Sequence, residues 1–368
     1  MCPRRLACFA FTLLALSACD APQPLRLGFI GGLSGANADL GSAGRNGVQL
    51  AIEQANAQGG IRGRPIELLV KDDQLDPEQG QRVTQQLIDA QVEAILGPMT
   101  SAVAVASAPL ATRAGLLMMA GTVTTQALAG QDDQFFRTIG STAQHAAIMA
   151  DYLYDERAIR QLNIAIDLRN RAYSESWLND FRVHFESLGG RIEHVQSYTS
   201  GAQTDFAALA RAARHGQPQA LVLITSALDA ALLCNQLRQQ QPGLLLATSE
   251  WAGTGKLIEL GGHAVEEVVV PNYLDQQSQV PAFMAFRQAY RQRFQHDPGY
   301  PAVVTYNATQ VVLQALTDQR PGEALKQTLL RQRDYQGLLD PIHFDDFGDV
   351  RSRTYLTLIR HGEFINAQ

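Results

Sequence analysis

The chain has 368 residues, of which 46% are hydrophobic and 18% charged, and its formal net charge is −6. This balance is typical of a folded globular protein and excludes a disordered chain. The length exceeds what one hydrophobic core usually serves, so we expect two lobes. A slight acidic excess, with no basic run beyond Arg4 and Arg5, argues against a nucleic-acid partner.

The first 18 residues have the pattern of a signal peptide. Arg4 and Arg5 precede an apolar run over residues 6–16. A membrane-spanning helix needs about 20 apolar residues, so this run is too short to be one. Export from the cytoplasm is therefore expected.

Leu16, Ser17, Ala18 and Cys19 together resemble the lipobox of bacterial lipoproteins. The resemblance implies cleavage before Cys19, lipidation of its thiol and a short tether over residues 19–24. An ordinary secretory signal, leaving Cys19 as a free thiol, is the alternative. Asp20 resembles the signal that retains lipoproteins in the inner membrane. We therefore expect a protein of the periplasm or cell envelope that a lipid anchor holds to the inner membrane.

The remaining cysteine predicts no internal disulfide. Cys2 and Cys8 leave with the signal peptide, so only Cys234 stays beside Cys19. Cys234 follows an apolar run over residues 230–233. Its expected role is that of a small buried apolar side chain on a helix.

From residue 25 onward, apolar runs alternate with amphipathic stretches. The predicted strands cover 25–30, 66–71, 94–97, 116–120, 162–166, 191–198 and 220–224. The predicted helices cover 42–58, 77–90, 102–114, 143–154, 174–188, 206–214 and 227–240. Alternating strands and helices indicate an α/β fold whose parallel sheets carry helices on both faces.

The alternation runs through twice, which predicts two Rossmann-like lobes. We expect one lobe over 25–142 and 273–349, and the other over 143–272 and 350–368. Helices predicted at 281–294 and 302–317 would then return to the first lobe. Three crossings between the lobes would form a hinge, with a ligand in the cleft beyond the carboxyl ends of the strands.

The strand that starts at residue 25 runs into a glycine-rich turn containing Gly31, Gly32 and Gly35. Its spacing matches neither a dinucleotide-binding nor a phosphate-binding loop, so no cofactor is expected. The glycines instead favour a sharp turn close to the cleft.

The sequence also argues against an enzyme. It contains no recognisable nucleophile with an adjacent base and no pair of carboxylates at working distance. Eight histidines, among them His145, show no spacing typical of metal ligands. They are interpreted as surface residues or as residues with satisfied hydrogen bonds, and no metal is expected.

A family resemblance begins at residues 55–66, which read Ala-Asn-Ala-Gln-Gly-Gly-Ile-Arg-Gly-Arg-Pro-Ile. Asp72, Asp73 and the pair Asp76 and Pro77 follow. This stretch resembles the periplasmic leucine/isoleucine/valine-binding protein family, the receptor subunits of branched-chain amino-acid ABC importers. The resemblance covers about residues 25–347. It implies a type I periplasmic binding fold, a small-molecule ligand and a partner ABC permease in the inner membrane.

The resemblance also implies binding residues in the first lobe. Ser101, at a helix start, and Thr124 match the residues that hold the ligand's α-carboxylate, and the Thr122 carbonyl matches an acceptor for its ammonium. Unpaired N–H groups and the helix dipole would add to the attraction for an anion. Simple helix capping by the two hydroxyls is the alternative.

Further residues are implied on the other side of the cleft. Glu250 matches the partner of the ammonium, and Tyr173 matches an aromatic wall. Tyr306 is expected to close the side. Glu250 as a solvated loop charge, and the tyrosines as simple packing residues, are the alternatives.

Two departures from the family leave the ligand open. Leu40 and the stretch around Ser226 stand where the family commonly has aromatic residues. Arg169 or Arg171, near the cleft, would suit a second carboxylate on the ligand.

The sequence therefore predicts a solute-binding lipoprotein of an ABC importer. Its lobes would close on an amino acid or related small carboxylate and deliver it to a membrane permease. An extracytoplasmic sensor of the same fold, which signals to a receptor or regulates a transporter, is the alternative.

Overall fold

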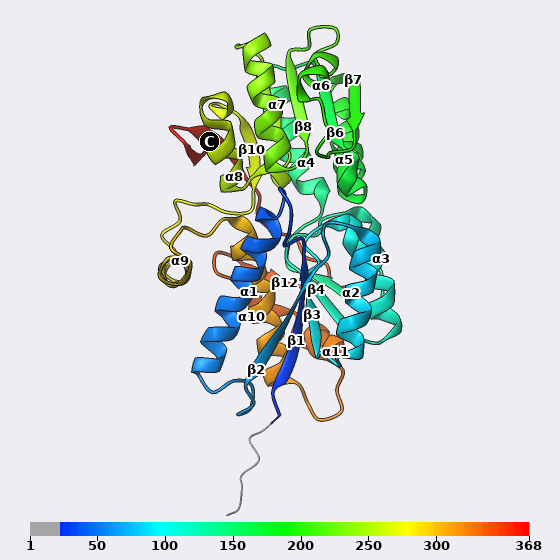
Figure 1. The fold of residues 1–368 in the computed structure, drawn as a ribbon, viewed down its shortest axis with the longest axis vertical. Helices are drawn as coiled ribbons and strands as arrows, with labels where there is room; N and C mark the ends of the chain where they lie inside the picture. Colours follow the sequence, from blue (N-terminus) through cyan, green and yellow to red (C-terminus); the bar gives the residue numbers. More distant parts are fainter. Residues whose placement is uncertain (1–22, 368) are drawn as a thin grey trace, which may run out of the picture.

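A computed structural model describes residues 23–367 of the chain as two α/β lobes arranged end to end (Figure 1). The predicted signal peptide and Cys19 lie outside the described residues. Between residues 23 and 367, no helix is long and apolar enough to cross a membrane.

The first lobe is built on a parallel sheet in the order β2-β1-β3-β4-β5. Its strands are β1 (Leu25–Gly31), β2 (Ile66–Asp72), β3 (Ala94–Leu96), β4 (Leu117–Ala120) and β5 (Phe135–Arg137). Alternating side chains of β1 serve both faces: Phe29 packs in the core that includes α1 (Asp39–Ala57), and Ile30 in the core with α2 (Pro77–Asp89) and α3 (Ser101–Arg113).

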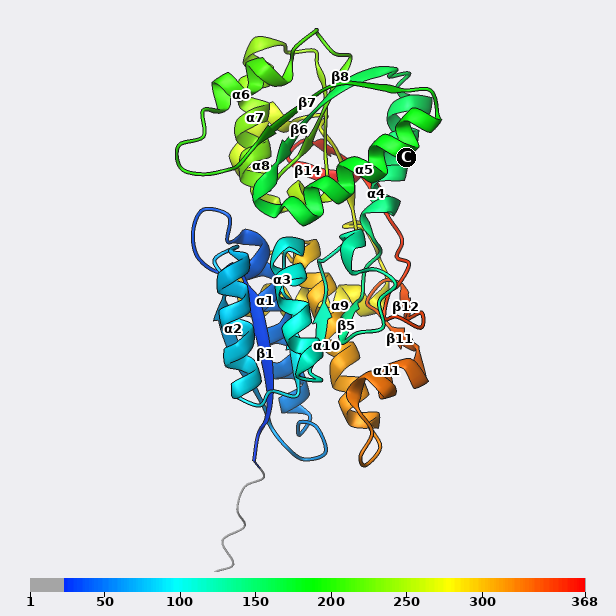
Figure 2. The same ribbon diagram turned by 90° about the vertical axis from the view of Figure 1, so that its right-hand side faces the viewer.

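Two glycines allow α1 to start close to the end of β1. A Cβ atom on Gly41 would lie 2.1 Å from the backbone oxygen of Gly32, which no side chain tolerates. The helix predicted from residue 42 therefore begins earlier, at Asp39. This turn brings the start of α1 to the face of the lobe that meets the second lobe (Figure 2).

The second lobe is built on a sheet in the order β14-β13-β10-β9-β8-β6-β7. Its strands are β6 (Gln161–Asp167), β7 (Arg191–Tyr198), β8 (Ala220–Ile224), β9 (Leu245–Thr248), β10 (Val269–Asn272), β13 (Tyr355–Arg360) and β14 (Glu363–Asn366). The core on one face includes α4 (Thr142–Asp151) and α5 (Arg171–Ser187). The core on the other includes α6 (Phe206–Ala213), α7 (Ala227–Gln240) and α8 (Gly255–Gly261).

The second sheet ends in two antiparallel strands that the sequence did not predict. β13 runs antiparallel to β10, and β14 runs antiparallel to β13. The chain makes this hairpin over Arg360, His361, Gly362 and Glu363, where His361 and Gly362 both have positive φ. A turn this tight joins only antiparallel neighbours, because parallel strands need a long crossover.

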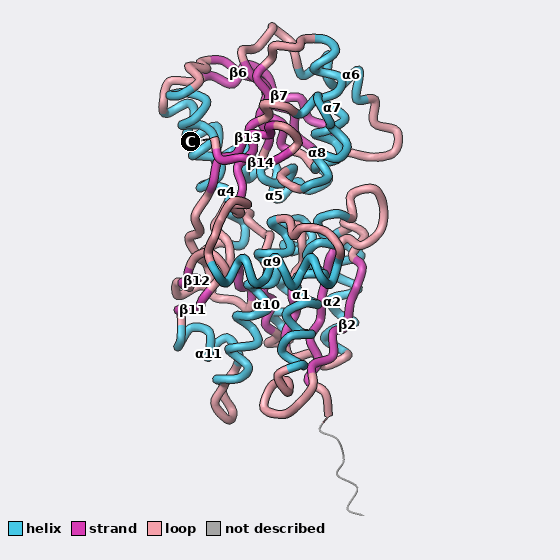
Figure 3. Tube along the Cα trace, turned by 90° about the vertical axis from the view of Figure 1, so that its left-hand side faces the viewer, coloured by secondary structure: helices cyan, strands magenta, loops and turns pink. Residues whose placement is uncertain are grey.

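Three crossings connect the lobes, as the fold class predicted. The chain passes from β5 to α4, returns from β10 to α9 (Pro281–Phe294), and passes again from the first lobe to β13. Between the last two crossings lie α10 (Tyr300–Asp318), α11 (Leu325–Gln332) and the hairpin of β11 (Asp334–Gln336) with β12 (Pro341–His343). α10 packs against α1 and the first sheet, and α9 crosses the outside of α1 (Figure 3).

Candidate functional site

Hydrogen bonds join the two lobes around the space between them. The Thr254 hydroxyl in the second lobe donates to Asp39 Oδ2 at the start of α1, at 2.7 Å. On another side, the Ala102 N–H in α3 donates to Asn170 Oδ1 at 3.0 Å. The facing ends of the lobes are therefore in contact, which encloses the side chains between them.

Ser101 and Thr124 lie at the facing end of the first lobe. Ser101 is the first residue of α3, Thr124 follows β4, and both are buried. Neither hydroxyl has a hydrogen-bond partner, and Thr100, the residue at the N-cap of α3, makes no side-chain cap. The capping alternative therefore does not account for these hydroxyls.

Thr122 is held in the same loop by its own hydroxyl, which donates to the Met99 carbonyl at 2.7 Å. This bond ties the loop after β4 to the loop before α3. The two loops that carry Ser101 and Thr124 are therefore held together.

Glu250 lies at the facing end of the second lobe, in the 3-10 turn Glu250–Ala252 that follows β9. Its side chain is only 3% exposed, which excludes the solvated loop charge. Oε2 accepts a hydrogen bond from Trp177 Nε1 at 2.9 Å, whereas Oε1 has no hydrogen-bond partner. Burial raises the pKa of Glu250 to about 7, because the charged form loses its hydration there.

Tyr173, on α5, is buried close to Glu250. Its hydroxyl lacks a hydrogen-bond partner, and its ring packs edge-on against Trp251 with centroids 5.7 Å apart. The two rings and Glu250 thus share one buried region of the second lobe.

His145, on α4, belongs to the same region and corrects the expectation that every histidine is exposed or satisfied. The ring is fully buried and neither nitrogen has a hydrogen-bond partner. Nδ1 lies 3.7 Å from Glu250 Oε1. Burial lowers the pKa of His145 to about 3, so the ring is neutral. Its one sequence signal was its place at the start of the helix expected after the first crossing.

Two tyrosines that the sequence analysis missed, Tyr273 and Tyr300, extend the buried aromatic group around His145. Tyr273 follows β10, its hydroxyl is buried without a partner, and its ring meets the His145 ring edge-on at 4.2 Å. Tyr300 is the first residue of α10 and lies 5.7 Å from the Tyr273 ring. Tyr300 brings the first lobe into contact with this aromatic group.

Tyr306 does not reach the cleft. Its hydroxyl donates to Gln54 Oε1 at 2.7 Å, and its ring packs on Phe286 at 4.7 Å. Gln54 lies fifteen residues, about 22 Å, along α1 from the interlobe contact at Asp39. Tyr306 therefore fits the alternative interpretation of a packed tyrosine. It stands almost two turns after the start of α10, the end of the helix that meets the second lobe, and its side chain contacts Gln54 and Phe286.

The two positions that depart from the family lie at or near the interlobe contacts. Leu40 is buried in α1, next to Asp39. Ser226 caps α7, accepting from the Asp229 N–H at 3.4 Å. When the oxygen and nitrogen of the Asn37 side-chain amide are exchanged so that both find hydrogen-bond partners, the nitrogen donates to Ser226 Oγ at 2.8 Å.

Of the two arginines considered for a second carboxylate, one lies at this contact. In the same orientation of Asn37, its oxygen accepts from Arg169 Nη1 at 2.9 Å, and Arg169 Nη2 lies 3.5 Å from Asp167 Oδ2. Arg171 is exposed and pairs with Glu175 one turn along α5.

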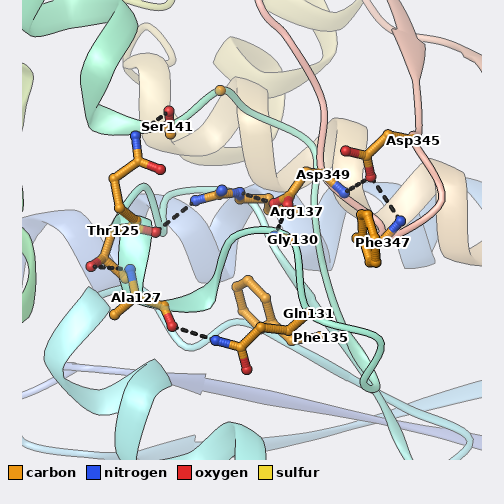
Figure 4. A network of polar contacts seen from close by, with 12 residues as sticks. Thr125, Ala127, Gly130, Gln131, Phe135, Arg137, Ser141, Asp345, Phe347 and Asp349 are labelled. Carbon is orange, nitrogen blue, oxygen red and sulfur yellow. Dashed lines mark hydrogen bonds and ion pairs between the residues drawn. The ribbon is translucent and has the colours of Figure 1, made fainter.

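Arg137 holds the loop that carries Thr124 (Figure 4). The guanidinium is 2% exposed and donates through Nη1 to the Thr125 carbonyl at 3.0 Å and through Nε to Asp349 Oδ1 at 2.6 Å. Asp349 Oδ2 also accepts from the Gly130 N–H at 2.7 Å. Arg137 ends β5 before the first crossing, and Asp349 precedes the third crossing. One ion pair therefore ties the loop after β4 to two crossing segments.

Within residues 23–367 no group of three or more His, Cys, Asp or Glu side chains is placed to hold a metal ion. Cys234 is buried as expected, and burial raises the pKa of its thiol to about 12, which keeps it protonated and unreactive. The two lobes do supply buried polar groups without partners: the hydroxyls of Ser101 and Thr124 in the first and the carboxyl of Glu250 in the second.

Comparisons with known proteins agree with this architecture. A family model described as periplasmic binding protein matches residues 24–361. The chain is 26% identical over 271 residues to the Leu/Ile/Val-binding protein homolog 3 of Brucella melitensis, with 73% of each chain covered.

Two solved structures are similar in fold. The first is the branched-chain amino acid transporter substrate binding protein LivJ from Streptococcus pneumoniae, in complex with isoleucine; its TM-score is 0.86 at 22% identity, covering 93% of this chain and 98% of that one. The second is a solute binding protein of an ABC transporter from Rhodopseudomonas palustris, in complex with 3,4-dihydroxy benzoic acid; its TM-score is 0.83 at 22% identity, covering 93% and 95%.

Proposed function

Since the chain belongs to the family of periplasmic binding proteins and is similar to Leu/Ile/Val-binding proteins, we propose that it captures an α-amino acid or a related small carboxylate between its lobes. It then delivers the ligand to an ABC permease and catalyses nothing. The observation that carries the proposal is a set of buried polar groups, contributed by both lobes, that have no hydrogen-bond partners.

The first lobe would hold the carboxylate. The hydroxyls of Ser101 and Thr124 are buried donors without acceptors, and Ser101 stands at the start of α3. An unsatisfied buried hydroxyl costs about 1–3 kcal/mol, and a carboxylate would recover this cost through charge-assisted hydrogen bonds. The N-terminal end of α3 adds a favourable dipole.

The second lobe would hold the ammonium. Glu250 Oε1 is a buried acceptor without a donor. Arg137 is the one Lys or Arg side chain that is buried in residues 23–367, and it is already paired with Asp349. A cationic group on the ligand would therefore be the missing counter-charge, with the Thr122 carbonyl as a second acceptor.

Closure of the lobes follows, because the two lobes would bind opposite ends of the same ligand. Only the closed arrangement lets Ser101 and Thr124 touch the same ligand as Glu250 and Tyr173, so the ligand would shift an open–closed equilibrium towards the closed form. Leu40 and Ser226, where the family commonly has aromatic rings, would shape the part of the pocket that accepts the ligand's side chain.

We also propose that the protein works outside the cytoplasm, held to the inner membrane through a lipidated Cys19. The lipobox-like residues at 16–19 support this proposal. Mass spectrometry of the N-terminal peptide from the native host should find an acylated Cys19, and a Cys19→Ser variant should be released from membranes. An unmodified cysteine in the native protein would contradict it.

A thermal-shift screen of residues 20–368, which contain both lobes, tests the ligand class. L-α-amino acids, their deaminated acids, dicarboxylates and aromatic acids should be compared over a concentration series. An α-amino acid should raise the melting temperature with concentration, because it binds only the folded state. A response to aromatic acids alone would reject the ammonium site at Glu250, and no response to any of these compounds would reject the proposed ligand class.

A further inference from the structure

We propose that His145 is a specificity-determining, ligand-contacting residue: with Glu250 it forms a two-acceptor site that requires a ligand group with several hydrogen-bond donors, as in a primary ammonium. This inference rests on the proposed function and narrows its ligand class to α-amino acids over their deaminated counterparts.

The geometry of the two side chains carries the inference. His145 Nδ1 and Glu250 Oε1 are 3.7 Å apart, too far for a hydrogen bond but close enough for one nitrogen to reach both at about 2.9 Å. Glu250 is fixed on its other side, since Trp177 Nε1 donates to Oε2 at 2.9 Å. Oε1 is therefore the free atom, and it lies on the side of the carboxylate towards His145.

The imidazole has no other use inside the protein. Neither nitrogen makes a hydrogen bond, although the ring is fully buried. Apolar packing alone would be served better by an aliphatic side chain, which has no polar atoms to desolvate. Tyr273 holds the ring in place edge-on at 4.2 Å.

The protonation state determines what the ring can accept. Burial keeps His145 neutral, so one ring nitrogen has a free lone pair. With the proton on Nε2, Nδ1 becomes an acceptor beside Oε1. A primary ammonium can donate to both atoms and still donate to a third acceptor, whereas a hydroxyl has one donor and would leave one acceptor unsatisfied.

The experiment compares paired probes that differ in the amino group: L-leucine against 4-methylpentanoate, and L-phenylalanine against 3-phenylpropionate. Dissociation constants are measured by calorimetry for the wild-type protein, for His145→Leu and for His145→Asn. The Asn oxygen can replace the Nδ1 acceptor, and the Leu side chain fills the space without one.

The wild-type protein should prefer an amino acid to its deaminated partner. His145→Leu should reduce that preference about tenfold, because it weakens binding of the amino acid and leaves binding of the deaminated acid unchanged. His145→Asn should recover most of the preference. An equal loss for both members of a pair would show a purely structural role. An unchanged preference in His145→Leu would overturn the inference while leaving the proposed function intact.

Two further outcomes reject the ammonium site itself. If the wild-type protein binds the deaminated acids as tightly as the amino acids, His145 and Glu250 do not select an ammonium. If it binds none of the four probes, the pair is replaced by the amino acid that gives the largest thermal shift in the screen and its deaminated acid, and a protein that binds no amino acid at all overturns the inference together with the proposed ligand class. Melting temperatures of the three proteins, measured without ligand, show that the variants are folded.

Discussion

Two buried polar regions of this molecule differ in how completely their groups are satisfied. In the network of Arg137 and Asp349, the charged groups find partners within the protein. In the second region, the proposed ligand site with Ser101, Thr124, His145 and Glu250, side-chain atoms from both lobes remain without partners. Native proteins rarely leave buried polar groups unsatisfied, and this supports the proposed ligand site in the second region. The first region is structural, and it holds the loop that the second depends on.

The largest expected effect comes from breaking the satisfied region. Arg137→Met should lower the free energy of unfolding by about 3–5 kcal/mol, because it leaves Asp349 without its ion pair and the Thr125 carbonyl without a donor. Urea denaturation of the unliganded protein measures it.

An exposed ion pair is the control for that variant. Arg26 and Glu67 pair at 3.0 Å with both side chains about half exposed, so Arg26→Met should cost less than about 1 kcal/mol. A similar loss in the two variants would mean that burial does not make the Arg137 pair special.

Glu250 offers the next largest effect, with a dependence on pH. Its pKa is raised from 4.5 to about 7, so between these values the folded protein binds more protons than the unfolded chain. The unfolding free energy must then fall as pH rises through this window. Glu250→Gln removes that contribution, and at pH 8 the unliganded variant should be more stable than the wild type by up to about 3 kcal/mol. At pH 4 the two should be alike, as urea denaturation at both pH values would show.

Asp73 provides a matched carboxyl for this prediction. It is fully buried in the turn after β2, where its Oδ1 accepts from the Leu75 N–H at 2.8 Å, and burial raises its pKa to about 7 as well. Asp73→Asn should change stability with pH in the same direction while leaving amino-acid binding intact. Glu250→Gln should also weaken amino-acid binding, and equal binding by both variants would count against the ammonium site.

A smaller effect separates binding from stability in the first lobe. Ser101→Ala and Thr124→Val remove buried hydroxyls without partners, so each should raise the unfolding free energy of the unliganded protein, by up to the about 1–3 kcal/mol that such a hydroxyl costs. Each should reduce the binding free energy of an α-amino acid by about 1.5–3 kcal/mol, the range for a hydrogen bond to a charged group. Calorimetric titration with L-leucine and a thermal melt measure the two quantities.

Thr84 is the control for the hydroxyl variants. Its buried hydroxyl donates to the Gly80 carbonyl at 2.7 Å within α2. Thr84→Val should alter stability slightly and leave ligand affinity unchanged. The contrast fails if Thr124→Val and Thr84→Val affect binding alike.

The smallest effect concerns Tyr306 and Tyr173, the two tyrosines that the family resemblance assigned to the ligand site. Tyr306→Phe loses the hydrogen bond to Gln54 and should lower the unfolding free energy by about 1 kcal/mol with no change in binding. Tyr173→Phe removes a hydroxyl without a partner and should instead weaken binding without loss of stability. Parallel titrations and urea melts would detect a reversal of these two effects.

Much of the fold was accessible from the sequence because it is written in local patterns. The strand over 191–198 and the helices over 227–240 and 281–294 have their predicted limits. The short strands β5 and β12 were missed, whereas β3, also three residues long, was predicted because it stands between two predicted helices in the regular alternation. The antiparallel ending of the second sheet was missed because pairing direction depends on where the chain returns.

The candidate site divides in the same way. Ser101 could be placed at a helix start because that position follows from the strand and helix on either side of it. His145 and Glu250, more than a hundred positions apart, carry no mark in the sequence of their 3.7 Å separation. Tyr300 and Tyr306 stand on one helix, and only the packing of α10 determines which of them reaches the other lobe.

By itself, then, the sequence determined the alternation of strands and helices, the two lobes with three crossings and the family resemblance, since each depends on residues close together in the chain. The tertiary structure alone decided which buried atoms lack partners, which carboxyls have raised pKa values and which arginine holds the binding loop. Burial and pairing arise from contacts between distant segments, such as Arg137 with Asp349 across 212 positions. Such contacts exist only once the chain is folded and its distant segments pack together.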